Sequence, residues 1–198
     1  ICIRDCYSNH KDFIRGYGFQ GSAKRGPKKL TMDNSYGEKL KADIQVPGGW
    51  SINIQGFGEI LPYHENKMYL DYNKKDKWGL PTVTFDAEIK ENEKIMRKDI
   101  VEQASEMLDF AGFKNVIPFE NKYSMGKGIH EMGTARMGRD PKTSVLNKYN
   151  QIHAVPNVYV TDGSSFTSSG NQNPSLTYMA LTARAADHAV KELKKMNF

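Results

Sequence analysis

The chain has 198 residues and a mass of 22.4 kDa, and it carries a formal charge of +5 at pH 7 with a pI near 9.0. A hydrophobic content of 38% with 26% charged residues is typical of a folded chain, and the length allows one or two domains. No apolar run approaches the roughly 18 residues that a membrane-spanning helix needs. The basic residues form short, scattered groups without a nucleic-acid-binding motif, so no nucleic-acid surface is expected.

The two cysteines, Cys2 and Cys6, have no further Cys or His pair placed to complete a zinc site. We therefore expect neither a metal centre nor a disulfide framework. The sequence begins at Ile1 rather than at a methionine, which suggests a fragment or a processed product, and it leaves the cellular compartment open.

The first half of the chain shows the alternation that is typical of β-strands. Trp50, Ile52 and Ile54 alternate with polar residues, and Val83 and Phe85 alternate with threonines. Glycines separate these runs. We predict strands joined by glycine-rich turns.

Two later segments have the period of an amphipathic helix. The first spans residues 91–111 and is closed by Gly112, and the second spans residues 174–194 and opens with Pro174. The apolar positions of the second helix recur every three or four residues: Leu176, Met179, Ala180, Ala183, Ala186 and Val190. A short β-rich run at residues 158–161 precedes it, and a loop rich in glycine and asparagine connects the two.

Residues 16–21 (GYGFQG) match the letters of the dinucleotide-binding pattern G-x-G-x-x-G. The pattern requires a buried strand before it and a helix after it, but the preceding residues are polar and Gly26-Pro27 stands where the helix should begin. We therefore reject a nucleotide site here. We predict instead a glycine-rich bend between strands, in which glycines permit positive φ and a close approach of neighbouring backbones.

Four short segments of the second half form an ordered series: 130–138 (HEMGTARMG), 144–147 (SVLN), 152–164 (IHAVPNVYVTDGS) and 170–177 (GNQNPSLT). The series resembles the signature of the glucose-methanol-choline (GMC) oxidoreductase family. In that family H-x-x-G-T-x-x-M-G, a V-V-D triplet, a segment like H-G-V-x-N-L-x-V-x-D-x-S and N-P-x-x-T follow one another. Each element alone is weak, but the order and spacing of all four make the resemblance specific.

The resemblance covers roughly residues 56–194 and is nearest to bacterial sugar or gluconate dehydrogenase-like members. It implies an α+β fold with an antiparallel substrate-domain sheet and flanking helices, plus a C-terminal strand and helix that would complete an FAD-binding α/β domain. Residues 1–120 would form part of the substrate-binding domain. Residues 121–198 would form the catalytic loop and the segment that returns to the FAD domain, whose N-terminal fingerprint is not in this sequence.

The resemblance assigns the chemistry to His130 and Asn173. Oxidation of an alcohol by hydride transfer needs a base near neutrality for the hydroxyl proton, which suits an imidazole. A carboxamide can hold the substrate oxygen as negative charge develops, without titrating. Asn173 also stands where a helix N-cap is expected, with Pro174 as the first helical residue. Three positions depart from the common family pattern. Glu131 stands where a small residue or proline is usual, Asn147 replaces an aspartate, and Asn173 stands where some members have a second histidine, a known family alternative.

The same resemblance implies that FAD is the cofactor. Asp162 and Gly163 would lie along its pyrophosphate and ribityl chain, with Gly163 small enough to admit it, and Asn173, Pro174 and Thr177 would face the flavin. A valine-rich strand of a parallel sheet is not stable without its neighbours. We therefore expect the 198-residue chain alone to bind FAD weakly or not at all, and a separate N-terminal FAD domain to be needed.

The implied activity is the FAD-dependent oxidation of an alcohol group of a sugar, sugar acid or polyol. Two alternatives stay open: an oxidase of the same family that uses oxygen, and a non-catalytic sugar-binding or interaction module. Taken alone, His130 would more often be a hydrogen-bonded structural residue, and Asn173 a helix cap. The remaining histidines match no catalytic position and are expected to be structural or on the surface: His10, His64, His153 and His188.

Overall fold

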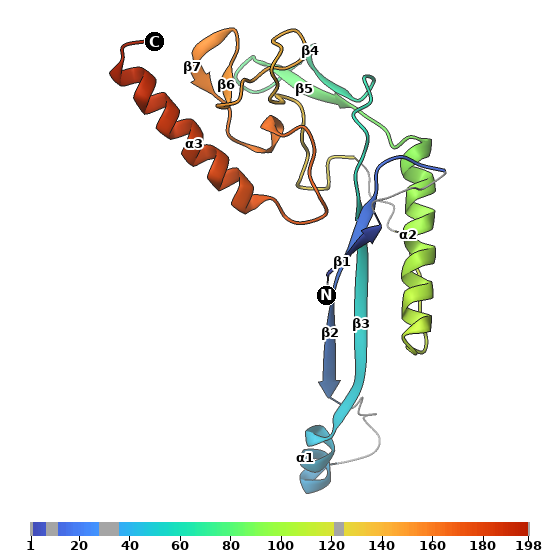
Figure 1. Ribbon diagram of the computed structural model, residues 1–198. Helices are drawn as coiled ribbons and strands as arrows, with labels where there is room; N and C mark the ends of the chain where they lie inside the picture. The colour runs from blue at the N-terminus through green and yellow to red at the C-terminus, as the bar shows by residue number, and fades with distance from the viewer. Residues whose placement is uncertain (1, 7–11, 28–35, 121–124, 198) are drawn as a thin grey trace. The chain divides into compact units, whose positions relative to one another are not determined.

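The computed structural model describes residues 2–6, 12–27, 36–120 and 125–197 (Figure 1). These residues form three α-helices and small antiparallel sheets, so the predicted α+β class is confirmed. The chain divides into two compact units. Unit 1 comprises Ile1–Gly58 and Met96–Glu120, and unit 2 comprises Glu59–Ile95 and Asn121–Phe198.

Unit 1 is built on a three-stranded antiparallel sheet of β1 (Cys2–Cys6), β2 (Tyr17–Pro27) and β3 (Pro47–Gly58), in that order. The predicted alternation around Ile52 lies in β3, which confirms that strand. The helix α1 (Gly37–Gln45) was not predicted. None of its side chains is buried, and its nine residues are too few for an apolar period to stand out in the sequence.

The glycine-rich segment at residues 16–21 enters β2 rather than forming a bend, so the predicted bend is wrong. None of its glycines has a positive φ. The expected close approach of backbones is present, because a Cβ at Gly21 would lie 2.2 Å from the carbonyl oxygen of Asn53 on β3. The segment is therefore part of an antiparallel ladder and not a strand-to-helix turn of the dinucleotide-binding kind.

The helix α2 (Glu91–Phe110) confirms the first predicted helix. Its part in unit 1 packs directly on glycines of β3: a Cβ at Gly56 would lie 2.2 Å from Ile100, and one at Gly58 would lie 2.4 Å from the sulfur of Met96. Gly112 has φ +82 and its N–H bonds the carbonyl of Asp109, so the helix ends at the glycine that the sequence indicated.

Unit 2 contains two antiparallel hairpins. β4 (Lys67–Lys75) pairs with β5 (Pro81–Asp86), which confirms the alternation around Val83 as a strand. β6 (Gln151–Ile152) pairs with β7 (Val155–Tyr159).

The β-rich run predicted at residues 158–161 lies only partly in β7, which ends at Tyr159. The resemblance places this run in a parallel sheet, whereas within the described part of the chain its partner is the antiparallel β6. The pairing is continued by one backbone bond, because the N–H of Val160 donates to the carbonyl of Asn150 at 2.9 Å in the same register.

The helix α3 (Ser175–Lys194) confirms the second predicted helix and follows a short 3-10 turn, η1 (Gly163–Ser165) (Figure 1). Ala185 is buried, but much of the apolar stripe lies in solvent. The exposed fraction is 79% for Leu176, 68% for Met179, 50% for Val190 and 64% for Leu193. A helix that is apolar on both a buried and an exposed face is typical of one that packs on a second partner.

The carboxylate of Glu93, which is only 3% exposed, fixes the start of α2 within unit 2. Its oxygens accept hydrogen bonds from the N–H of Leu61 at 3.1 Å, the N–H of Lys90 at 3.1 Å and the hydroxyl of Tyr63 at 3.2 Å. Burial and the charge of Glu93 raise the pKa of Tyr63, so this hydroxyl keeps its proton and remains a donor. A negative charge in the first turn of a helix also interacts favourably with the positive end of the helix dipole.

We expect Glu93→Gln to lower the free energy of unfolding of the chain by about 1–3 kcal/mol, because a carboxamide turns an N–H toward groups that are themselves donors. Denaturant unfolding of the two proteins measures the difference. As a control, Glu91→Gln changes a carboxylate of the same turn that is 73% exposed, and it should cost less than about 0.5 kcal/mol. Equal losses for both variants would contradict the role of the buried carboxylate.

Candidate active site

Two segments of unit 2 that are 43 residues apart in the sequence meet at a histidine and an asparagine. The Nε2 atom of His130 lies 3.1 Å from the Oδ1 atom of Asn173. His130 is half-buried, whereas Asn173, in the loop before α3, is exposed. The structure therefore brings together the two residues to which the sequence assigned the chemistry.

The second ring nitrogen of His130, Nδ1, is buried and makes no hydrogen bond with any residue that the structure describes. When Oδ1 of Asn173 is the acceptor, Nε2 carries the ring proton and Nδ1 has a free lone pair. When the amide is turned round, Nδ1 carries an unused N–H. Either state leaves a buried polar atom unsatisfied, at a cost of about 1–3 kcal/mol.

The backbone before the histidine is strained. Ile129 has φ +58, in the left-handed region that β-branched residues rarely adopt, and its side chain is 84% exposed, so packing does not explain it. The segment that follows is fixed by backbone hydrogen bonds from Ala135 to Ser164, at 3.0 Å, and from Met137 to Ser165, at 2.9 Å. Such strain persists where neighbouring contacts hold the chain, and it is often found at functional sites.

The predicted cap of α3 is wrong by one residue. The cap position is occupied by Pro174, which provides no side-chain hydrogen bond, and the helix begins at Ser175. Pro174 itself is buried. Asn173 lies outside the helix with its side chain at His130, so capping does not explain its position.

The remaining residues predicted to bind the cofactor lie on the turn before η1 and on α3. The carboxylate of Asp162 accepts hydrogen bonds from the N–H of Ser164, at 2.9 Å, and from its hydroxyl. Thr177 is exposed on the first turn of α3. At Gly163 a Cβ would lie 2.7 Å from the hydroxyl of Tyr178 and 3.2 Å from the carbonyl of Glu131, so a residue without a side chain is needed at this position.

Tyr178 was missed by the sequence analysis. Its ring packs edge-on against Phe166, with ring centres 4.9 Å apart and planes at 67°. Burial raises the pKa of its hydroxyl, and the charges of Asp162 and Glu131 raise it further. The available signal was its place directly after the N-P-x-x-T pattern, but a tyrosine within an apolar helix face is usually assigned to the core.

The side chain of Asn150 connects the end of the β6–β7 hairpin with α3. It is fully buried and has φ +63. Its Nδ2 donates to the carbonyl of Val160 at 3.0 Å, and its Oδ1 accepts from the guanidinium of Arg184 on α3 at 3.2 Å. Sequence alone gave no signal for this role, because it depends on contacts with residues 10 and 34 positions away.

We expect Asn150→Ala to destabilise the chain by about 2–4 kcal/mol, because it removes both side-chain bonds and places an alanine at a positive φ. Asn150→Gly should be milder, because glycine adopts this φ without strain. Thermal and denaturant unfolding measure both variants, with the exposed Asn157→Ala as a control that should cost less than about 0.5 kcal/mol. A glycine variant less stable than the alanine variant would contradict the backbone argument.

The other histidines contact structural partners or lie on the surface. His153 Nε2 is 3.1 Å from the hydroxyl of Ser144. His188 stacks on Tyr149 at 3.9 Å, and its Nδ1 is 2.9 Å from the hydroxyl of Tyr159. His64 is exposed, and His10 lies outside the described residues.

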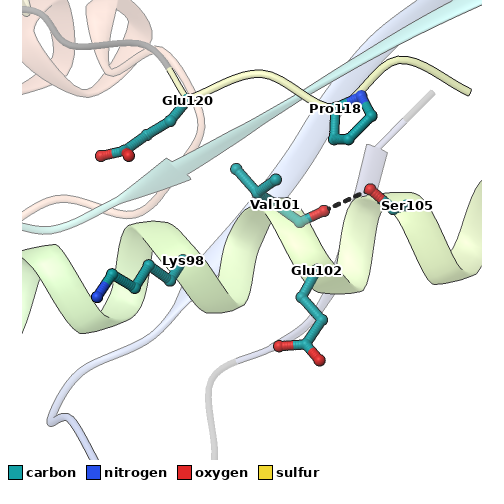
Figure 2. A pocket seen from close by; sticks show the side chains of 6 residues that line it. All are labelled: Lys98, Val101, Glu102, Ser105, Pro118 and Glu120. Atoms are coloured by element: carbon teal, nitrogen blue, oxygen red, sulfur yellow. Dashed lines mark hydrogen bonds between the residues drawn. The ribbon is translucent and has the colours of Figure 1, made fainter.

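A separate recess of about 350 Å³ lies in unit 1, beside α2 (Figure 2). It is lined by Lys98, Val101, Glu102, Ser105, Pro118 and Glu120. The hydroxyl of Ser105 is committed to the carbonyl of Val101 at 2.8 Å. None of the predicted site residues lines this recess, and its lining does not combine a base with a second polar group of the kind that His130 and Asn173 provide.

Residues 2–6, 12–27, 36–120 and 125–197 contain neither a candidate metal site nor a helix that could span a membrane. No group of three or more His, Cys, Asp and Glu side chains is placed to hold a metal ion. No helix in these ranges combines the length and the apolar character needed to cross a membrane.

Residues 62–182 match the sequence model of the family described as GMC oxidoreductase, and the chain therefore belongs to the GMC oxidoreductase family. This confirms the predicted family. Members of this family are FAD-dependent.

Three relatives are similar to most of the chain. The identity is 32% over 193 residues with 2-methyl-1,2-propanediol dehydrogenase of Mycolicibacterium austroafricanum and 29% over 176 residues with the fructose dehydrogenase large subunit of Gluconobacter japonicus. It is 28% over 166 residues with the gluconate 2-dehydrogenase flavoprotein of Pantoea cypripedii. The alignments cover 90%, 88% and 80% of this chain but 33%, 31% and 26% of the relatives. The chain thus spans no more than about a third of the length of these relatives.

The residues of the candidate site fit a flavin in their chemistry. A flavin ring and its ribityl chain carry carbonyls, ring nitrogens and hydroxyls, which pair with uncharged donors and acceptors. The site offers Nε2 of His130, the exposed amide of Asn173 and the hydroxyl of Tyr178.

Proposed function

We propose that this chain is the catalytic C-terminal portion of an FAD-dependent dehydrogenase that oxidises an alcohol group of a sugar, sugar acid or polyol. The observation that carries the proposal is the 3.1 Å contact between His130 Nε2 and Asn173 Oδ1, because it joins a base and an uncharged hydrogen-bonding group at one point. The relatives support the substrate class, since their names describe dehydrogenases of a diol, of fructose and of gluconate.

In the proposed reaction the substrate hydroxyl lies between the imidazole and the carboxamide. His130 accepts the hydroxyl proton at a ring nitrogen as the carbon loses its hydride. Asn173 donates to or accepts from the same oxygen and holds the carbon in position, without changing its own charge. FAD, when bound, supplies the acceptor for the hydride.

The proposal also assigns a role to each part of the chain. Residues 1–120 contribute to the substrate-binding domain, and residues 121–198 carry the catalytic loop and return to the FAD domain. Asp162, Gly163, Asn173, Pro174 and Thr177 form the surface that faces the cofactor. The remaining cofactor contacts come from the part of the parent protein that this sequence does not contain.

In the full-length parent protein, we expect His130→Ala to lower the rate of flavin reduction by sugar or polyol substrates by about 10²–10⁴, because the proton acceptor is lost. Stopped-flow absorbance of the flavin under anaerobic conditions measures this step. The variant should still show a flavin spectrum, and the exposed His64→Ala should reduce its flavin at the parental rate.

Reduction of the His130→Ala variant at the parental rate would contradict the assignment of the base. A colourless parent protein would sink the flavin proposal and favour a binding module. Steady-state assays with dye acceptors and with oxygen then separate a dehydrogenase from an oxidase.

We also propose that the exposed apolar stripe of α3 is covered by the FAD domain of the parent protein. Met179→Asp should then change the stability of the 198-residue chain by less than about 0.5 kcal/mol, because Met179 is 68% exposed in it. In the full-length protein the same change should cost about 2–4 kcal/mol, because it buries a charge. Thermal unfolding compares both, with Lys195→Ser, at the exposed C-cap position outside the stripe, as the control. A small effect in both proteins would overturn the packing proposal.

A further inference from the structure

Tyr178 provides a polar group at the candidate site to which the proposed function gives no role. Its hydroxyl oxygen is the atom nearest to the point where a side chain of Gly163 would begin, at 2.7 Å, and it makes no hydrogen bond with the described residues. Tyr159 in the same unit differs, because its hydroxyl bonds Nδ1 of His188 at 2.9 Å. One half-buried tyrosine therefore has a protein partner, and the other presents an unused hydroxyl at the turn.

The position of this hydroxyl is fixed from both ends. The Tyr178 N–H bonds the carbonyl of Pro174 at 3.0 Å, which anchors the residue in the first turn of α3. The ring packs edge-on against Phe166, whose own N–H bonds the carbonyl of Gly163 at 3.1 Å. The tyrosine and the turn that it faces are thus parts of one packed group.

The charged groups near the Tyr178 hydroxyl determine which kind of ligand it can bind. Burial and the charges of Asp162 and Glu131 raise the pKa of Tyr178, so at neutral pH the group is protonated and can donate. The same two carboxylates disfavour a phosphate at this point, because like charges repel. An uncharged acceptor oxygen is the ligand that fits.

The geometry points to Tyr178 as a cofactor-positioning residue, whose hydroxyl donates a hydrogen bond to an uncharged oxygen of the bound flavin, a ribityl hydroxyl or a ring carbonyl, beside Gly163. This inference rests on the proposed function. It adds a donor from α3 to the predicted cofactor contacts of Asp162 and Gly163, and it explains why a polar ring occupies a helix position that an apolar side chain could fill.

Titration of the full-length apoprotein with FAD, followed by flavin fluorescence, tests the inference. Tyr178→Phe keeps the ring on Phe166 and removes only the hydroxyl, so the Kd for FAD should rise about 3- to 10-fold while the melting temperature of the apoprotein stays unchanged. The flavin absorption maximum should shift as well, because one hydrogen bond to the cofactor is lost. Tyr159→Phe is the matched control and should leave the Kd and the spectrum unchanged.

A combination with Gly163→Ala tests the contact itself. The alanine methyl group would collide with the hydroxyl, so Tyr178→Phe should cost less in the Gly163→Ala background than in the parent protein. Strictly additive losses would contradict the geometry.

Three results would overturn the inference. An unchanged Kd and spectrum for Tyr178→Phe, in a protein whose parent binds FAD, removes the proposed contact and leaves the proposed function intact. If Tyr178→Phe raises the KM for the substrate and leaves the Kd for FAD unchanged, the hydroxyl contacts the substrate and not the flavin. A parent protein that does not bind FAD removes the proposed function and this inference with it.

Discussion

The geometry of unit 2 depends on the buried side chain of Asn150. Through one amide it connects the end of the β6–β7 hairpin, at Val160, with the guanidinium of Arg184 on α3. The chain beyond Val160 leads directly to Asp162, and Arg184 lies on the helix that carries Tyr178, so the Asn150 side chain connects the segments that hold these two residues. A fully buried amide can hold such a joint only if its donor and its acceptor are both used, and here they are.

The candidate site is formed by two separate segments of the chain, and each segment supplies one of its two residues. His130 comes from a loop that is tied to η1 by backbone hydrogen bonds, and Asn173 comes from the loop that enters α3. Each segment is fixed by contacts other than the one between the two side chains. The relative position of the two side chains is therefore set by the surrounding structure and not only by their mutual contact.

Periodicity and motif order predicted much of this arrangement. The helices α2 and α3 and the strand β3 follow from their apolar spacing, and the family motifs named His130 and Asn173 before their contact was known. The sequence did not predict the roles of Asn150 and Tyr178, because each depends on residues brought close only by folding. The start of α3 was misplaced because Pro174 suits the first turn of a helix and also the cap position, and only the observed backbone, with φ −91 and ψ 7, separates the two.

The left-handed backbone of Ile129 has a consequence for attempts to improve this protein by selection for heat resistance. Replacement by glycine or asparagine would relax the chain at that point, because both residues adopt a positive φ more readily than isoleucine. The same relaxation would give the neighbouring imidazole more freedom of orientation. Selection for heat resistance alone would thus act against the constraint that holds this imidazole in place.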